Sequence, residues 1–297
     1  MTPRAARTPP WPAVRFAPDF LRRVERLLVR LAGARERREG AGRSAILGAG
    51  EEFVGYRPYR PGEDLRALDW SLLARLDRPF VRVTRREAGE RWAVLVDASA
   101  SMGVGPPGKL QRAAEVACAL ACLGLRVRAR VRVLVSSARK RGAFELELAR
   151  RGDPAALLAF LEERRAAGGC GLATLLATPR RFASAGRVFL VGDFQDLEPR
   201  ALFGLVCRGR DLAALQLLAP VELDPPPAGA VEWWDPELGQ ELCMQVDRAA
   251  VGAYERSLER RLETWRTTCA RHGITYGCWS SASAFEDVVQ SILRLRT

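Results

Sequence analysis

Apolar and polar positions follow two different periods along most of the chain. Short continuous apolar runs have the length of buried strands, and they are predicted at residues 92–96, 187–191, 212–218 and 274–278. Longer stretches repeat apolar positions with helical spacing, and they are predicted at residues 109–123, 154–165, 172–182, 198–206, 249–271 and 284–295. Strands separated by helices in this way indicate an α/β fold with a doubly wound, mostly parallel sheet.

Two further pairs of segments complete the predicted sheet and its insertion. Residues 127–135 and 144–148 alternate apolar and polar positions strictly, which predicts an antiparallel pair at one edge. A proline-rich turn at residues 224–229 precedes a predicted hairpin at residues 231–246, which makes a hairpin insertion near 225–247.

Changes in composition and in the apolar/polar pattern along the chain predict four segments. Residues 1–18 are rich in proline and are expected to be disordered or to lie draped on the surface. Residues 19–39 are predicted to form an amphipathic helix that packs on its own domain. As alternatives, this helix lies on a membrane surface or binds a partner. Residues 40–90 contain glycines, turns and an alternating strand, typical of a small β-rich subdomain, and residues 91–297 form the main domain.

Charge and cysteine content narrow the function classes. The 297 residues carry a net charge of +12, nearly all from arginine, which permits an acidic protein, a membrane surface or a nucleic acid as partner. The arginines are dispersed and lack interleaved aromatic residues, which argues against nucleic acid and leaves peripheral membrane contact open. Seven cysteines without a CxxC pair, and a single histidine, argue against a disulfide framework or a structural zinc site.

Neither a membrane span nor a secretory leader is visible in the sequence. No apolar run reaches the ~18–20 residues that cross a bilayer, and the N-terminal stretch lacks the apolar region of a signal peptide. The sequence therefore predicts a cytoplasmic protein.

The segment "AVLVDASASMG" (residues 93–103) contains the strongest chemical signal. Asp97 ends a predicted buried strand, and Ser99 and Ser101 follow at alternate positions. Asp193 ends a second buried strand, and ligands bind such sheets outside the carboxyl ends of the strands. If the two strands are neighbours, two carboxylates and two hydroxyls meet in one crevice and could hold Mg²⁺.

This segment resembles the metal-ion-dependent adhesion site of von Willebrand factor A domains. The stretch "YRPYRPGEDLRALDW" (residues 56–70) resembles the signature that precedes the A-type domain in the family called domain of unknown function 58, and "APVELDPPPAGAVEWWDPELG" (residues 219–239) resembles a later segment of that family. The resemblance covers residues 20–295. It implies a von Willebrand factor A-like fold and a non-enzymatic protein-interaction module that works with a MoxR-type AAA+ ATPase. It also implies a metal held by Asp97, Ser99, Ser101 and Asp193, with a partner's carboxylate completing the shell.

One loop departs from the family pattern. Cys170 stands where a threonine ligand is expected, Gly171 replaces an acid, and a thiol is a poor ligand for Mg²⁺. Two alternatives therefore stay open: a metal-free scaffold of the same fold, and a metal-dependent hydrolase of phosphate esters. The hydrolase alternative lacks an obvious general base, since nothing in the sequence ties His272 to the crevice.

Two other motifs carry structural interpretations. "GVGPPGKL" (residues 103–110) fits the spacing of a phosphate-binding loop, but Leu110 follows Lys109 where a hydroxyl is needed, and two prolines remove amide donors. We therefore interpret it as a loop that starts a helix. The family signature contains Gly62, Asp64, Arg66, Asp69 and Trp70. We interpret Gly62 as part of a tight turn, and Asp64, Arg66 and Asp69 as a structural ion-pair network that fixes the small subdomain rather than as a ligand site.

Overall fold

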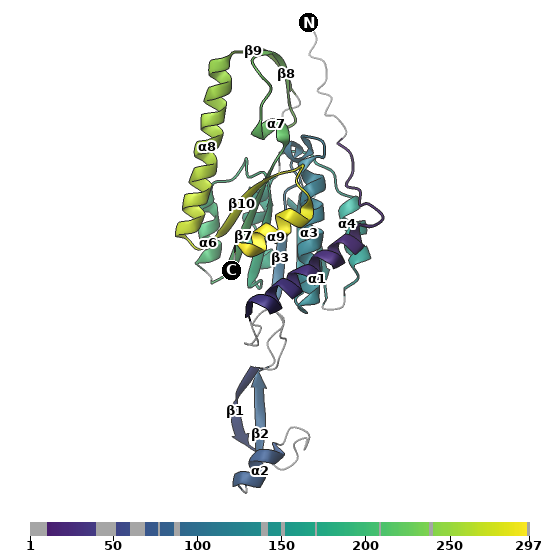
Figure 1. Ribbon diagram of the computed structural model, residues 1–297, viewed down its shortest axis with the longest axis vertical. Helices are drawn as coiled ribbons and strands as arrows, with labels where there is room; N and C mark the ends of the chain where they lie inside the picture. Colours follow the sequence, from purple (N-terminus) through teal and green to yellow (C-terminus); the bar gives the residue numbers. More distant parts are fainter. Residues whose placement is uncertain are drawn as a thin grey trace.

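A six-stranded sheet forms the centre of the protein in the computed structural model (Figure 1). The structure describes residues 11–39, 52–59, 69–76, 78–85, 90–137, 142–149, 152–169, 171–207, 209–237 and 240–295. The strands of this sheet are β3 (Arg91–Val96), β4 (Arg130–Ser137), β5 (Gly142–Leu148), β6 (Arg187–Gly192), β7 (Asp211–Leu218) and β10 (Thr275–Ser280). Their order is β10-β7-β6-β3-β4-β5, and all neighbours are parallel except β4 and β5. The predicted α/β fold class and the antiparallel edge pair are confirmed.

The sequence of the central strand β3 is continuously apolar because both faces of the strand are buried. Every residue after Arg91 is buried, and the side chains alternate between two cores. Val94 and Val96 enter one core, whereas Ala93 and Leu95 enter the other. A strand covered on both faces has no polar side to display, so the alternation typical of exposed sheets is absent.

Helices cover the two faces of the sheet. One core contains residues of α1 (Phe20–Glu39), α3 (Lys109–Arg126), α4 (Pro154–Glu162) and α9 (Phe285–Arg294). The other contains residues of α5 (Leu172–Leu176), α6 (Phe203–Val206) and α8 (Arg248–Arg271), with 3-10 turns at Pro179–Phe182 and Pro199–Leu202. The prediction of one helix over 172–182 is wrong. Pro179 disfavours helical backbone at Thr178, so α5 ends early and a separate turn follows.

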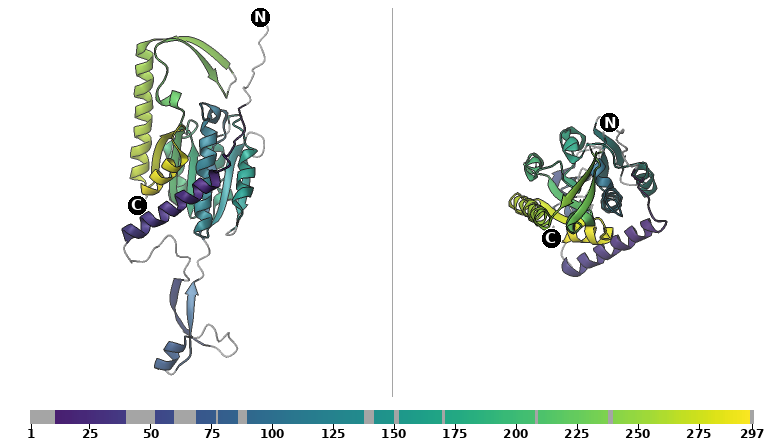
Figure 2. Two further views of the ribbon diagram at one scale, coloured as in Figure 1. Left: turned by 45° about the vertical axis from the view of Figure 1, so that its right-hand side comes forward. Right: turned by 90° about the horizontal axis from the view of Figure 1, so that it is seen from above.

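The N-terminal segment packs against the main domain. The expectation of disorder is wrong for residues 11–18, because Val14 is buried and donates its backbone N–H to the carbonyl of Arg164 at 3.3 Å; residues 1–10 lie outside the described part. In α1, Phe20 and Val24 enter the core, and Arg23 pairs with Glu286 at 2.8 Å. The amphipathic helix therefore buries its apolar face on its own domain (Figure 2, right).

The expected β-rich segment contains a hairpin and a short helix. β1 (Glu52–Pro58) pairs antiparallel with β2 (Phe80–Arg85), and α2 (Trp70–Leu76) lies between them in sequence. Asp69 Oδ1 accepts a hydrogen bond from the backbone N–H of Leu72 at 3.0 Å, as a helix-capping residue does, and Trp70 is exposed. Gly62, Asp64 and Arg66 lie outside the described residues, so the ion-pair network stays a prediction.

A second hairpin stands at the carboxyl end of the sheet. The short helix α7 (Pro220–Leu223) follows β7 and leads to β8 (Gly229–Asp235) and β9 (Gln240–Val246), after which α8 runs back alongside the sheet (Figures 1 and 2). Within the described residues, no helix is both long and apolar enough to cross a membrane.

Candidate functional site

The candidate site lies where the strand order reverses. β3 pairs with β4 on one side and with β6 on the other, so the connections that leave β3 and β6 diverge there. Asp97 follows β3, Asp193 follows β6, and the Asp97 backbone N–H donates to the carbonyl of Val191 at 2.9 Å. The expectation that the two strands are neighbours is confirmed, and both acids lie at the crevice where such sheets bind ligands.

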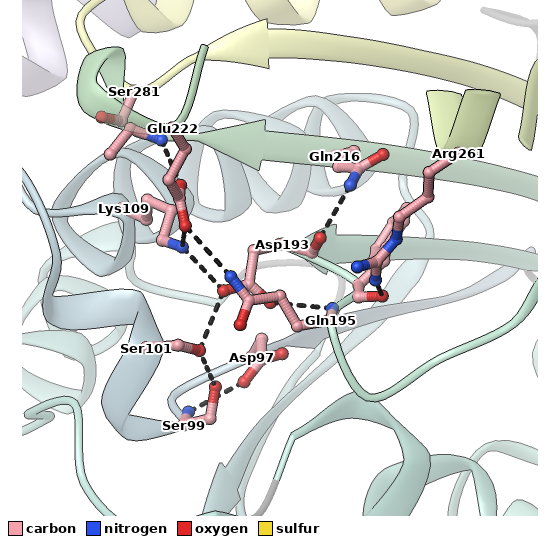
Figure 3. A network of polar contacts seen from close by, with 12 residues as sticks. Asp97, Ser99, Ser101, Lys109, Asp193, Gln195, Gln216, Glu222, Arg261 and Ser281 are labelled. Atoms are coloured by element: carbon pink, nitrogen blue, oxygen red, sulfur yellow. Dashed lines mark hydrogen bonds and ion pairs between the residues drawn. The ribbon is translucent and has the colours of Figure 1, made fainter. Parts of the chain in front are cut away.

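The four predicted ligand residues are brought together (Figure 3). Ser101 Oγ donates to Asp193 Oδ2 at 2.8 Å, and the hydroxyls of Ser99 and Ser101 are 3.0 Å apart. Asp97 Oδ1 accepts from the backbone N–H of Ser99 at 2.8 Å. Each of the four side chains is at most 4% exposed, so the cluster is almost completely removed from solvent.

Close packing fixes the loop that carries Asp97. The backbone N–H of Ala98 donates to Ser136 Oγ at 2.7 Å, which ties the loop to the end of β4. Gly192 lies opposite on β6, and a Cβ there would be 2.7 Å from Cβ of Asp97. Only glycine leaves room for the Asp97 side chain at this close approach of two strands.

The loop that carries Asp193 contains a left-handed residue. Phe194 has φ of 58°, a conformation that is costly for an aromatic residue. Burial holds it there, because its ring packs against Trp265 with centroids 4.8 Å apart and its carbonyl accepts from Arg261. This turn redirects the chain directly after Asp193, so the strained backbone is part of what positions the acid.

Lys109, which belongs to the segment interpreted from the sequence as a loop that starts a helix, lies inside the site. Lys109, the first residue of α3, is completely buried. Its Nζ lies 2.8 Å from Asp193 Oδ2 and 2.6 Å from Glu222 Oε1. The sequence did contain a signal for this placement: Lys109 is a cation at the start of a predicted helix. The helix dipole disfavours a positive charge there unless acids lie nearby.

Glu222 connects the site to α7 and α8. Its Oε2 accepts from the backbone N–H of Ala219 at 2.6 Å, and its Oε1 also accepts from Gln195 Nε2 at 3.0 Å. The hydroxyl of Tyr254 on α8 donates to the Glu222 carbonyl at 2.8 Å. Glu222 therefore joins Lys109 to the elements on either side of the β8–β9 hairpin, through its carboxylate to Lys109 and through its backbone carbonyl to α8.

Gln216 supports the backbone of Asp193 from β7. It is 1% exposed, its Nε2 donates to the Asp193 carbonyl at 2.7 Å, and its Oε1 accepts from the hydroxyl of Tyr276 at 2.6 Å. We predict that Gln216→Met lowers the free energy of unfolding by about 1–3 kcal/mol, because it removes both hydrogen bonds in a buried place. Urea unfolding measures this, with Gln195→Met as the more exposed control. Equal losses in the two variants would contradict the prediction.

Electrostatics in the crevice favour a cation. Burial, followed by the charge of Asp193, raises the pKa of Asp97 to about 8. Asp97 Oδ2 is buried and has no hydrogen-bond partner among the described residues. The pKa of Asp196 is also raised, by burial and by Asp193. A carboxylate oxygen that is buried without a donor is costly, and a bound cation would remove that cost.

The donor set fits a hard cation. It consists of the two carboxylates of Asp97 and Asp193 and the two hydroxyls of Ser99 and Ser101, all oxygen ligands of the kind that Mg²⁺ takes. In the described part of the chain, no group of three or more histidine, cysteine, aspartate or glutamate residues is arranged to hold a metal. Any cation here therefore depends on the serine hydroxyls and on ligands from outside.

The loop that departs from the family pattern is partly described. Cys170 lies outside the described residues, so its position as a ligand stays untested. At Gly171 a Cβ would be 2.5 Å from Asp196 Oδ2, and that oxygen accepts from the backbone N–H of Ala173 at 3.2 Å. Asp196, which the sequence analysis missed, thus places a carboxylate beside the position where an acid was expected.

A cavity of about 180 Å³ opens beside the acids. Asp193 and Glu222 form one side of it, and Arg261 on α8 contributes a basic group. His272 is not part of this region; its ring lies 3.8 Å from that of Phe203, at the end of α8. Of the four predicted ligand residues only Asp193 lines this cavity, so the cavity leaves room for a side chain from outside beside Asp193, whereas the single histidine is placed elsewhere.

Comparison with known proteins assigns the family. Residues 55–264 match the family described as "Protein of unknown function DUF58". The chain belongs to this family. Similar proteins of Mycobacterium tuberculosis and Mycobacterium bovis, described as uncharacterized, are 29% identical over 223 residues, which is 71% of this chain and 69% of theirs.

Similar solved structures were also found. One is the conserved hypothetical protein BatB from Bacteroides thetaiotaomicron, with 17% identity, a TM-score of 0.45 and coverage of 70% of this chain and 98% of that one. Another is the SpRpn10 VWA domain, with 9% identity, a TM-score of 0.39 and coverage of 69% and 95%.

Proposed function

We propose that this DUF58 protein is a non-enzymatic protein-interaction module with a divalent-cation site. Asp97, Ser99, Ser101 and Asp193 would hold Mg²⁺, and a carboxylate of a partner protein would complete its shell. The observation that carries this proposal is the Asp97 carboxylate, which is fully buried with Oδ2 unpartnered among the described residues. The bound cation would supply a positive charge that a partner's acid recognises, and the serines would orient it.

The proposed partner follows from the family resemblance. A MoxR-type AAA+ ATPase is the natural candidate, with a role in assembling or maturing another complex. The net charge of +12 suits an acidic partner surface, because opposite charges speed encounter and fix orientation.

A specific observation favours a second candidate, a metal-free scaffold. The ammonium group of Lys109 already contacts Asp193 Oδ2, and Ser101 donates to the same oxygen. In this candidate, Lys109 supplies the positive charge of the site, and partners bind through other surfaces.

Co-purification separates the two candidates. The proposal predicts that the tagged protein retains a co-expressed MoxR-type ATPase in Mg²⁺ and loses it in EDTA, and that Asp97→Asn abolishes retention. Asp287→Asn, which changes an exposed acid of α9, serves as the matched control and should behave as wild type. Retention that resists both EDTA and Asp97→Asn would favour the metal-free scaffold.

A further inference from the structure

A second cavity, of about 280 Å³, lies at the amino ends of β3 and β4. Asp97 follows the other end of β3, so this cavity is separate from the candidate cation site. Ala93 and Phe182 contribute apolar walls. The charged residues that line it are Arg91, Arg130, Arg132, Arg181 and Glu147. We call this cavity the basic recess, because four cations and a single acid of the described residues line it.

The strand register gathers most of these charges on one face of the sheet. Arg91 lies beside Arg130 across the parallel pair of β3 and β4, and Ala93 lies beside Arg132. Arg132 in turn lies opposite Glu147 across β4 and β5. Since residues two positions apart on a strand share a face, these side chains lie on the face where Ala93 enters the core.

Two of the four arginines are paired with acids. Arg132 Nη2 lies 2.6 Å from Glu147 Oε2, and its Nε lies 3.3 Å from Glu145 Oε1. Arg181 Nη1 lies 3.9 Å from Glu145 Oε2. Two carboxylates therefore balance the charges of Arg132 and Arg181. The planar guanidinium group that binds carboxylates in this way has the geometry to bind phosphate as well.

The charges of Arg91 and Arg130 are not balanced in this way. Within the described part of the chain, neither guanidinium group forms an ion pair or a hydrogen bond. Both groups lie close enough to act on Glu147, whose pKa is lowered first by its hydrogen bond with Arg132 and further by the charges of all three arginines. Like charges side by side on neighbouring strands are destabilising, so an anion bound between them would be stabilised.

We propose that the basic recess binds a phosphate monoester, whose two negative charges balance those of Arg91 and Arg130. A phosphate monoester carries a charge of about −1.5 to −2 at pH 7, which matches the excess of two arginines. The recess offers more space than a phosphate group alone requires, and Ala93 and Phe182 provide apolar surface for the organic part of the ligand. This inference goes beyond the proposed function and does not depend on the cation at Asp97.

Calorimetric titration in EDTA at constant ionic strength tests the inference, with inorganic phosphate, glycerol 3-phosphate and a phosphoserine peptide as probes. We expect saturable binding to wild type, about 10-fold weaker binding to Arg91→Gln and to Arg130→Gln, and loss of binding in the double variant, because each substitution removes a charged hydrogen-bond donor. Arg126→Gln is the matched control and should bind as wild type does. It changes an exposed arginine at the end of α3, which covers the opposite face of the sheet.

The three probes distinguish the possible sources of the phosphate group. Binding that is tightest for glycerol 3-phosphate supports a small organic phosphate, and binding that is tightest for the peptide supports a phosphorylated side chain of a partner. Absence of saturable binding of every probe to wild type would overturn the inference, as would equal affinities in wild type and the double variant.

Thermal unfolding provides a second measurement on the same proteins. The phosphate probe that binds most tightly should raise the Tm of wild type and leave the Tm of the double variant unchanged. Equal increases in both proteins would contradict a site at Arg91 and Arg130. Both variants should fold as wild type does, because the two guanidinium groups form no ion pair within the described residues.

Discussion

Lys109→Met is expected to lower the free energy of unfolding by about 3–5 kcal/mol in EDTA, because removal of one partner leaves buried charges without compensation. Lys109 is completely buried, Asp193 is 1% exposed, and both acids that contact Nζ lie within 2.8 Å of it. Methionine has a similar volume, so the loss reports the charge rather than a cavity. Urea unfolding in EDTA measures it.

The same variant links stability to the cation. A divalent cation would replace the missing positive charge, so Mg²⁺ should stabilise Lys109→Met more than it stabilises wild type. Arg126→Met removes an exposed cation from the last turn of α3 and should cost less than about 1 kcal/mol. If Lys109→Met is as stable as wild type in EDTA, the ammonium does not balance these acids.

Asp97→Asn is expected to have the opposite effect in EDTA. The pKa of Asp97 is raised from 3.8 to about 8, so the folded state holds this proton more tightly than the unfolded state does. Below pH 4 both states are protonated and the group costs nothing. Between pH 4 and about pH 8 the unfolded state releases this proton while the folded state keeps it, so stability falls with rising pH until the folded state ionises as well. Asn avoids this loss, which reaches several kcal/mol since one pKa unit is worth about 1.4 kcal/mol.

Unfolding curves between pH 4 and pH 8 test this expectation. In EDTA, wild type should lose stability across this range and Asp97→Asn should lose much less, so that the variant is the more stable protein at pH 8. Asp287→Asn again provides the control, because its acid is exposed. Parallel pH profiles for wild type and Asp97→Asn would show that the buried carboxylate does not carry this cost.

Local patterns were sufficient to predict the sheet and the two acids. Each buried strand is a short apolar run that ends at a polar residue, and parallel strands place those ends at one edge of a sheet. Asp97 and Asp193 could therefore be paired from the sequence alone. The same reasoning wrongly predicted one continuous helix at residues 172–182, where Pro179 begins a separate turn. It also wrongly predicted disorder at residues 11–18, where Val14 is buried in the core.

The remaining members of the site depend on contacts between distant segments. Lys109 meets an acid 84 positions away and another 113 positions away, and no local period encodes either distance. Glu222 and Gln216 are likewise placed by how α7 and β7 meet the loop after β6. The spacing of glycines around Lys109 suggested a phosphate-binding loop and gave no indication of the acids that contact it. A sequence motif describes residues that are close in sequence, whereas these acids are close to Lys109 only in the folded structure.

Calorimetric titration of Mg²⁺ into wild type and Asp97→Asn tests the central claim most directly. The proposed site predicts saturable binding to wild type, and at least about 100-fold weaker binding to Asp97→Asn, since even residues that only orient ligands change metal affinity by 10–100-fold. Identical titrations of the two proteins, with or without binding heat, would contradict a cation site at Asp97.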